Sequence, residues 1–404
     1  MSTVAVARPQ LAHLSAALDD LRARGTHFRL RVLEDEQAPV CTYDGRQVIN
    51  LASNNYLGLC NHPKLREAAI AATRQFGVGS GAVRTIAGTM RIHMELEEKI
   101  ARFKNVEACV VFQSGFTANA GTVSSILGKG DFILSDELNH ASIIDGARLS
   151  GAKIKVFRHK DVPHAEELLR EIEHEPGRKL IITDGVFSMD GDIGPVDKLA
   201  ALAEKYNAIM MVDDAHASGV LGRNGRGSVD HFNVHGRVDV QVGTLSKAIG
   251  ALGGYVCGSR DLIDFLYHRA RPFLFSTSHP PSVAATCIAA FGILETEPER
   301  IERLWSNTHY FQDQLRHAGF DIGGNSTPAS ETPITPILLG DGRQTMAFSR
   351  ALFDHGVMAT GLAFPTVPEG KARIRCILTS EHTRPQLDQA LETIHSVAKE
   401  TGVL

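Results

Sequence analysis

Short, continuously apolar runs recur through the middle of the chain, and they constrain the fold more than any other feature of the sequence. They do not alternate apolar with polar residues, so each is expected to be a parallel strand buried on both faces. The runs are ACVVF (108–112), FILSD (132–136), KLIITD (179–184), AIMMVDD (208–214) and VDVQVGT (238–244). Helix-like segments accompany them at 91–104, 115–128, 195–206 and 259–270. This repetition of strand and helix predicts an α/β fold with a mainly parallel central sheet.

The two ends of the chain follow other patterns. Leucines at helical spacing predict an amphipathic helix over 10–24, within an N-terminal arm and helix at 1–50. Towards the C-terminus, a long helical stretch, a loop NSTPASETP and then strands and helices in mixed order predict a smaller α+β domain over 291–404. Residues 51–290 form the large α/β domain in this division. A chain of 404 residues is too long for one simple core, which also favours two domains.

Bulk composition narrows the possible functions. The net charge is −4, so there is no basic excess of the kind that nucleic-acid binding requires. No apolar run approaches the roughly 18 residues that span a membrane, and the opening MSTVAVARPQ has no long apolar run, so we expect a cytoplasmic protein without a signal peptide. The six cysteines show no CxxC spacing, which predicts neither a zinc site nor a disulfide framework.

The motif DDAH (213–216) follows an apolar strand, where α/β enzymes place ligand groups. An acid there can pair with the protonated pyridinium nitrogen of pyridoxal 5′-phosphate (PLP). Two carboxylates and a histidine are also possible metal ligands. The third alternative is structural, with Asp214 capping a helix and His216 a satisfied buried side chain. The motif alone leaves these three interpretations open.

The next strand ends in GTLSKAIGALGG (243–254), which places Lys247 among small residues. Such surroundings leave room for a bulky planar ring, and desolvation there would lower the pKa of the amine, which suits imine chemistry. Thr244 and Ser246 are possible donors to a phosphate. A surface lysine in a flexible loop is the structural alternative, but a lysine that follows an Asp-x-x-His strand end strengthens the PLP interpretation.

Further polar loops follow the other strands. FQSGFTANAG (112–121) opens a helix near Gly115, where backbone N–H groups bind phosphate well. His140 follows another strand and is placed to stack on a planar ring, while Ser188 could bond a ring hydroxyl. Because these strand ends meet at one edge of one sheet, together they indicate a binding site more strongly than any one alone. Each loop by itself also fits an ordinary strand–helix turn.

The segment FPTVPEGKARIR (364–375) carries two arginines at alternate positions of a predicted strand. Arg373 and Arg375 should therefore point to the same side. A guanidinium binds a carboxylate through two hydrogen bonds, so one of them is a natural anchor for an amino acid. A surface ion pair is the structural alternative.

The chain resembles the α-oxoamine synthases, a group of fold-type I PLP enzymes related in fold to aspartate aminotransferase. The resemblance extends from about residue 50 to 382. It is carried by the segments NLASNNYLGL, GSGAVRTIAGT, HMELEEKIARF, SGFTANAG, DELNHASIIDG, TDGVFSMDGDI, MVDDAHASGVLG, GTLSKAIGALGG, RPFLFSTSHPP and TVPEGKARIRC. Members join an amino acid to an acyl-CoA thioester and release CoA.

The resemblance implies a role for each matching residue. Lys247 would carry PLP as a Schiff base, Asp213 would pair with the pyridinium nitrogen, His140 would stack on the ring, and His216 and Ser188 would contact the ring hydroxyl. The catalytic residues it implies are Lys247, His140, Asp213 and His216. The cofactor-binding residues it implies are Gly115, Phe116, His140, Ser188, Asp213, Asp214, His216, Thr244, Lys247, Ser276 and Thr277. No metal is expected.

On the substrate side, Asn54, His140, Arg375 and Thr366 are the residues that the resemblance implies. Ser276 and Thr277 would reach the phosphate from a neighbouring subunit, which makes the working unit a homodimer with shared sites. The small-molecule partners are an amino acid and an acyl-CoA, with neither nucleic acid nor membrane.

Within the family, TVPEGKARIR, NHASIIDG and TDGVFSMDGD look most like glycine C-acetyltransferase (2-amino-3-ketobutyrate CoA ligase). The second expectation is 8-amino-7-oxononanoate synthase, which uses L-alanine with pimeloyl-CoA or a pimeloyl carrier protein in the biotin pathway. From another class, a PLP aminotransferase or aldolase would share the lysine and the aspartate without needing CoA.

Overall fold

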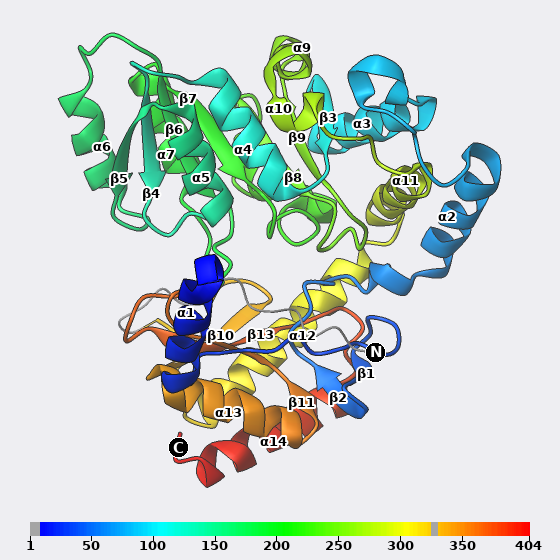
Figure 1. The fold of residues 1–404 in the computed structure, drawn as a ribbon, viewed down its shortest axis with the longest axis vertical. Coiled ribbons are helices and arrows are strands. Elements are labelled where there is room, and N and C mark those ends of the chain that lie inside the picture. Colours follow the sequence, from blue (N-terminus) through cyan, green and yellow to red (C-terminus); the bar gives the residue numbers. More distant parts are fainter. Residues whose placement is uncertain (1–8, 325–329) are drawn as a thin grey trace.

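The apolar runs assemble into one seven-stranded sheet, which occupies the upper lobe of the molecule in Figure 1. The computed structural model describes residues 9–324 and 330–404, so the loop predicted at 325–333 lies partly outside the described residues. The strand order is β3 (Ala108–Phe112), β9 (Gly254–Gly258), β8 (Val240–Thr244), β7 (Ile209–Asp213), β6 (Lys179–Asp184), β4 (Phe132–Asp136) and β5 (Lys153–Phe157). β9 runs antiparallel to both neighbours and the pairs from β8 to β5 are parallel, so the prediction of a mainly parallel α/β sheet is confirmed.

Helices cover both faces of this sheet from β3 to β4, which is why those strands are almost fully buried, whereas the edge strand β5 is largely exposed. In β3, Val110 and Phe112 belong to the core on one face, whereas Cys109 and Val111 belong to the core on the other. The first face is packed by α4 (Gly115–Ile126), α5 (Ala141–Ser150), α9 (Arg260–Arg269) and α10 (Arg271–Leu274). The second is packed by α2 (Pro63–Phe76), α3 (Arg91–Lys104), α6 (Val162–Glu171), α7 (Val196–Lys205) and α11 (Pro281–Thr296).

The lower lobe in Figure 1 combines segments from both ends of the chain. One small sheet joins β1 (Val40–Tyr43), β2 (Arg46–Asn50) and β11 (Val357–Met358). The other joins β10 (Ile334–Gly340), β13 (Ala372–Ile377) and β12 (Thr360–Leu362). Helices α12 (Glu299–His317), α13 (Gly342–Asp354) and α14 (Arg384–Glu400) belong to the same lobe. Part of the segment predicted as an N-terminal arm is thus a pair of strands in this lobe, and the domain limits remain a prediction.

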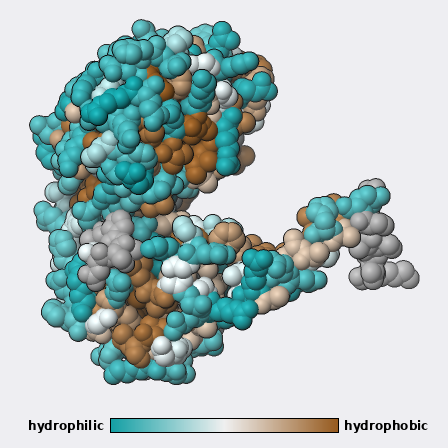
Figure 2. Space-filling view, turned by 90° about the vertical axis from the view of Figure 1, so that its left-hand side faces the viewer, coloured by the Kyte–Doolittle hydropathy of each residue, from teal (hydrophilic) through white to brown (hydrophobic). Residues whose placement is uncertain are grey.

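Two features of the helices refine the sequence analysis. The long helical stretch predicted before the loop at 325–333 is two helices, because Pro298 lies between α11 and α12 and proline cannot continue a helix. Helix α1 (Ala12–Ala23) forms where leucine spacing predicts it but has no buried residue, and Figure 2 shows the segment that carries it extending away from the body. Among helices in the described part of the chain, none combines the length and apolar character that crossing a bilayer needs.

Candidate active site

The carboxyl ends of the central strands meet at one edge of the large sheet, and the predicted site residues gather there. Asp184 at the end of β6 lies opposite Asp213 at the end of β7, and Asp213 lies opposite Val242 in β8. The N-termini of α4 and α5 follow β3 and β4 directly. The fold therefore brings together groups that are far apart in the sequence.

Asp213 and Asp214 point into different environments. Asp213 Oδ2 accepts from Asn119 Nδ2 at 2.6 Å and its Oδ1 accepts from the backbone N–H of Ala215 at 2.8 Å. Asp214 is instead fully buried against Lys104, whose Nζ lies 2.8 Å from Asp214 Oδ2, and it also accepts from Ser228 Oγ at 2.5 Å. The carboxylate of Asp214 is thus held by a lysine and a serine, and the expectation that Asp214 binds the cofactor stays a prediction that these contacts do not favour.

This divergence also bears on the metal alternative for the DDAH motif. A metal site would need the two carboxylates and His216 to converge on one point. Among residues 9–324 and 330–404 no group of three or more histidine, cysteine or acidic side chains has a metal-binding arrangement. The motif is thus split between an acid that faces the strand-end site and an acid that faces the core.

Lys247 lies in the turn that follows β8. Burial lowers the pKa of its amine to about 8, against smaller opposing effects of Asp213 and Asp184, and the positive charge of Arg375 lowers it further. No salt bridge within 4.0 Å engages Lys247 in the described chain, in contrast to Lys104. The result is an amine that is partly neutral near pH 8 and surrounded by two acids and a distant guanidinium.

His216 is held by a buried tyrosine. Tyr56 Oη lies 2.7 Å from His216 Nδ1, and both side chains are buried. Burial, followed by the charges of Lys247 and Arg375, lowers the pKa of His216 well below its usual value, and burial raises the pKa of Tyr56. Tyr56 therefore stays protonated and donates a hydrogen bond to Nδ1, so the neutral imidazole carries its proton on Nε2.

His140 begins α5 with an exposed ring. Its backbone N–H donates to Asp184 Oδ2 at 2.8 Å, and its Nδ1 lies 2.7 Å from Ser142 Oγ. Asp184 itself is buried, and burial together with the charge of Asp213 raises its pKa well above the usual range. The exposed ring at the strand-end edge is free to contact a bound molecule.

The N-terminus of α4 forms a small cradle beside β8. Ser114 caps the helix by accepting from the backbone N–H of Thr117 at 3.1 Å, which leaves the N–H groups of Gly115 and Phe116 at the open end of the helix. A Cβ on Gly115 would lie 3.5 Å from the Cβ of Thr244, which is ordinary contact distance, so the two segments are close neighbours. Such a helix end with a nearby hydroxyl suits a phosphate.

Ser276 and Thr277 lie near the same region in this chain. The carbonyl of Thr277 accepts from Gln113 Nε2 at 2.7 Å, and Thr277 forms an antiparallel bridge with Val83. The preceding Phe275 is 73% exposed. This segment therefore borders the strand-end site but presents an apolar side chain outwards.

Arg373 and Arg375 point to the same side of β13, towards the loop that follows β6. Arg375 donates to the carbonyl of Ser188 at 3.0 Å, and its buried Nε has no partner in the described chain. Arg373 donates to the carbonyl of Met189 at 3.0 Å and pairs with the carboxylate of Asp190. Arg373 is thus neutralised by an acid, whereas Arg375 has no carboxylate within salt-bridge distance among the described residues.

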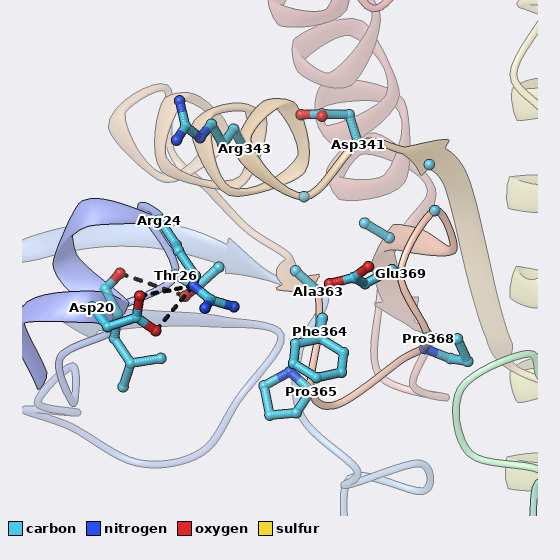
Figure 3. A pocket seen from close by; sticks show the side chains of 15 residues that line it. Asp20, Arg24, Thr26, Asp341, Arg343, Ala363, Phe364, Pro365, Pro368 and Glu369 are labelled. Carbon is cyan, nitrogen blue, oxygen red and sulfur yellow. Dashed lines mark hydrogen bonds and ion pairs between the residues drawn. The ribbon is translucent and has the colours of Figure 1, made fainter. Parts of the chain in front are cut away.

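The remaining substrate residues differ in their surroundings. Asn54 has a buried side-chain oxygen without a partner in the described chain. Thr366 is exposed in the loop between β12 and β13, and its neighbours Phe364 and Pro365 line a separate cavity of about 560 Å³ beside α1. Figure 3 shows that cavity with Asp20 of α1 and Arg24, which follows the helix, on one side, and Lys247 is not in its lining.

Sequence reasoning missed Tyr56, Asn119 and Asp184. Tyr56 and Asn119 stand inside the quoted segments NLASNNYLGL and SGFTANAG, but spacing gives no sign that they contact His216 and Asp213. Asp184 ends a strand, and that position is the signal that could have identified it. Contacts between segments so far apart are visible only in the folded chain.

Comparison with known proteins agrees with this geometry. The family model for aminotransferase class I and II matches residues 46–394. An 8-amino-7-oxononanoate synthase of Symbiobacterium thermophilum is 57% identical over 387 residues, 96% of this chain and 97% of that protein. An 8-amino-7-oxononanoate synthase of Bacillus subtilis is 55% identical over 391 residues, 97% of this chain and 98% of that protein. The solved serine palmitoyltransferase of Sphingomonas wittichii has a TM-score of 0.92 at 32% identity, covering 98% of this chain and 99% of that one.

The chain belongs to the aminotransferase class I and II family and has the fold-type I PLP-dependent transferase fold. Within that family it is an α-oxoamine synthase, a PLP-dependent enzyme of the acyl-transfer type. The expectation that glycine C-acetyltransferase is the nearest activity is not supported, since relatives at 51–57% identity are named 8-amino-7-oxononanoate synthase. That activity was the second expectation from the sequence.

Proposed function

We propose that this chain is an 8-amino-7-oxononanoate synthase, which condenses L-alanine with a pimeloyl thioester, loses the carboxylate as CO2 and releases the thiol carrier. The observation that carries the proposal is the identity of 57% with a protein of that name over 96% of this chain. The strand-end site supports the same reaction class, because it combines a desolvated lysine with an acid, a neutral histidine and an unpaired guanidinium.

The residues at the site fit PLP. Lys247 has an amine of lowered pKa without a salt-bridge partner in the described chain, which suits covalent attachment to an aldehyde. Asp213 has a carboxylate fixed by Asn119 and would hold the pyridinium nitrogen. His216 would direct its Nε2–H to the ring hydroxyl, which Ser188 also borders, and the exposed ring of His140 would lie on the cofactor face.

Three further segments would hold the phosphate. The open N–H groups of Gly115 and Phe116 begin α4, and Thr244 lies beside them with its hydroxyl. Ser276 and Thr277 would serve the phosphate of a partner subunit. The flanking side chains Phe116, Leu252 and Phe275 are 45%, 53% and 73% exposed, which supports a second copy of the chain covering this edge.

Arg375 is the proposed anchor for the carboxylate of the amino acid, and Asn54 and Thr366 are the further substrate contacts that the family resemblance implies. PLP supplies an electron sink that stabilises negative charge at the substrate Cα. Lys247 Nζ would take the Cα proton, because an amine with a pKa of about 8 is partly neutral at physiological pH. His216 would stay neutral throughout, because burial lowers its pKa well below the usual value.

A thiol-release assay tests the proposal. L-alanine and glycine are each combined with acetyl-, succinyl-, pimeloyl- and palmitoyl-CoA, and kcat/KM is compared across the eight pairs. We expect the highest value with L-alanine and pimeloyl-CoA. A preference for glycine with acetyl-CoA would instead establish glycine C-acetyltransferase, which the segment TVPEGKARIR resembles. Turnover of amino acids without any acyl-CoA would point to the aminotransferase or aldolase alternative.

The proposed homodimer has its own test. We expect a dimeric mass by light scattering at assay concentration. We also expect that mixing inactive Lys247→Ala with a weak Thr277→Ala variant restores activity, because a mixed dimer contains one intact site if the subunits share sites. A monomer with full activity would refute the shared site.

A further inference from the structure

His159 lies between two carboxylates, outside the set of residues assigned above. It follows β5, and its Nδ1 is 2.9 Å from Asp136 Oδ1 while its Nε2 is 2.9 Å from Asp192 Oδ2. A neutral imidazole has one N–H and would turn a lone pair towards one of these oxygens. Both contacts are satisfied at once only when the ring is an imidazolium that donates at both nitrogens.

The charges around His159 favour that form. Burial lowers the pKa of His159, but the bonds to Asp136 and Asp192 outweigh it and raise the pKa to about 9. Lys160 opposes this only partly, since its Nζ lies 3.0 Å from Asp192 Oδ2 and 3.3 Å from Glu331 Oε2. The titratable groups that face this cluster are Asp136, Glu137, Asp184, Asp192, Lys160 and Glu331.

Asp192 is part of the loop that follows β6, and His159 packs against that loop as well as bonding to it. The loop is closed by the bridge between Val186 and Ile193. The backbone N–H of Phe187 donates to the carbonyl of Asp192 at 3.0 Å, and the rings of Phe187 and His159 meet edge to face with centroids 4.4 Å apart. His159 thus contacts both Phe187 and Asp192, which stand next to the bridge that closes the loop.

The tip of the same loop meets the small lobe. The carbonyl of Ser188 accepts from Arg375 at 3.0 Å, and the carbonyl of Gly191 accepts from Thr332 Oγ1 at 2.8 Å. Ser188 O is the one hydrogen-bond partner of the Arg375 guanidinium in the described chain. The position of the loop therefore determines where Arg375 points.

We infer that His159, as an imidazolium between Asp136 and Asp192, is a positioning residue that fixes the loop after β6 and thereby aims Arg375 at the carboxylate of the amino-acid substrate. The inference rests on the proposed role of Arg375. It assigns His159 no contact with substrate or cofactor, so its effect should fall on amino-acid binding rather than on the acyl thioester.

The direction of the pH effect follows from the raised pKa. In the folded protein the imidazolium persists until the pH rises through about 9, so amino-acid affinity should fall above that pH. The contribution of the cluster to stability is complete below the unfolded pKa of about 6.5 and is lost as the pH rises through the folded pKa. Amino-acid affinity and the stability contributed by the cluster should therefore both fall at alkaline pH.

The experiment measures the Kd of L-alanine and of glycine for the PLP-loaded enzyme, from the change in visible absorbance, between pH 7 and 10. We expect His159→Gln to weaken both amino acids by roughly ten-fold at pH 7.5 and to lose the fall above pH 9, with the KM for pimeloyl-CoA changed by less than about two-fold. Asp192→Asn removes one of the two carboxylates that raise the pKa of His159, so the fall in amino-acid affinity of this variant should occur at lower pH. The histidine Cε1–H NMR signal that disappears in His159→Gln should titrate near pH 9 in the wild-type enzyme.

His164→Gln is the matched control, because His164 lies five residues further on and accepts only from the backbone N–H of Arg158 at 3.0 Å. It should leave amino-acid affinity unchanged. Wild-type amino-acid affinity in both His159→Gln and Asp192→Asn would overturn the inference, as would an unshifted pH profile in Asp192→Asn. The Kd of the amino acid is measured without the acyl substrate. A different acyl preference would therefore contradict the proposed function without affecting this test. If His159→Gln does not fold, Asp192→Asn decides the question.

Discussion

Two lysines lie near the end of β7, and they differ in whether a carboxylate is within salt-bridge distance of the amine. Lys104 is fully buried with its Nζ 2.8 Å from Asp214, and this pairing raises its pKa despite the cost of burial. Lys247 lies near Asp213 without a salt bridge in the described chain, and burial lowers its pKa to about 8. Of the two adjacent acids, Asp214 pairs with the structural Lys104, whereas Asp213 lies near Lys247 and leaves its amine available for chemistry.

The comparison teaches that burial alone does not make a lysine reactive. A close carboxylate keeps the ammonium charged, and a desolvated amine with acids only at a distance is partly neutral. The arginines of β13 repeat the contrast, since Arg373 is paired with Asp190 and Arg375 contacts only a carbonyl. In both pairs the side chain left without an acid is the one that faces the strand-end site.

The largest effect should come from Lys247→Ala. We expect loss of covalent PLP attachment and a fall in turnover by several orders of magnitude, because both the attachment point and the proposed base are removed. Borohydride reduction followed by peptide mass analysis locates the label. A label still found on this variant in the same yield would mean that another lysine carries the cofactor.

Lys104→Met should affect stability instead of chemistry. Asp214 would be left buried without its cation, which costs about 3–5 kcal/mol in the free energy of unfolding. Urea denaturation measures this loss, and the double variant Lys104→Met/Asp214→Asn should recover much of it. The single variant should still attach PLP when folded. Unchanged stability with lost PLP binding would reverse the roles assigned to the two lysines.

Arg375→Ala should have the smallest of the three effects. Loss of a charge-assisted contact of about 1.5–3 kcal/mol weakens amino-acid binding by about ten- to a hundred-fold and leaves the KM for acyl-CoA nearly unchanged. Arg375→Lys should rescue binding only in part, because a point charge does not reproduce the guanidinium fork. Arg373→Ala is the comparison variant: it removes the ion pair with Asp190 and a tie to the loop after β6, so it should lower stability and weaken amino-acid binding less than Arg375→Ala does. The opposite pattern would make Arg373 the anchor.

Sequence alone predicted five of the seven strands of the large sheet, and β5 and β9 were not among the predicted runs. Its strands are local apolar runs, and the runs at 108–112, 132–136 and 179–184 coincide with β3, β4 and β6. The strand ends then indicated where Lys247, Asp213 and His216 would meet. Local patterns gave this much because the buried parallel sheet imposes continuous hydrophobicity on each strand.

The rest depends on contacts between distant segments. Adjacent carboxylates look alike in a sequence, so the pairing of Asp214 with Lys104 was not predictable, nor was the bond from Tyr56 to His216. The expectation of glycine C-acetyltransferase is also not supported, because the motifs around PLP serve a step common to the whole family and do not distinguish its members. His159 follows a short edge strand whose sequence carries no sign of Asp192.

The parallel pairing of β2 with β11 has a consequence for how the chain folds. Ile49 lies opposite Val357, so the lower lobe joins residues made early in synthesis to residues made near its end. Bringing such distant segments together costs loop-closure entropy, whereas the strands of the large sheet all lie between residues 108 and 258. The large sheet can therefore form while the ribosome is still working. Val48 and Ile49 are buried in the finished protein, and the strand that pairs with Ile49 is not available until Val357 has been synthesised.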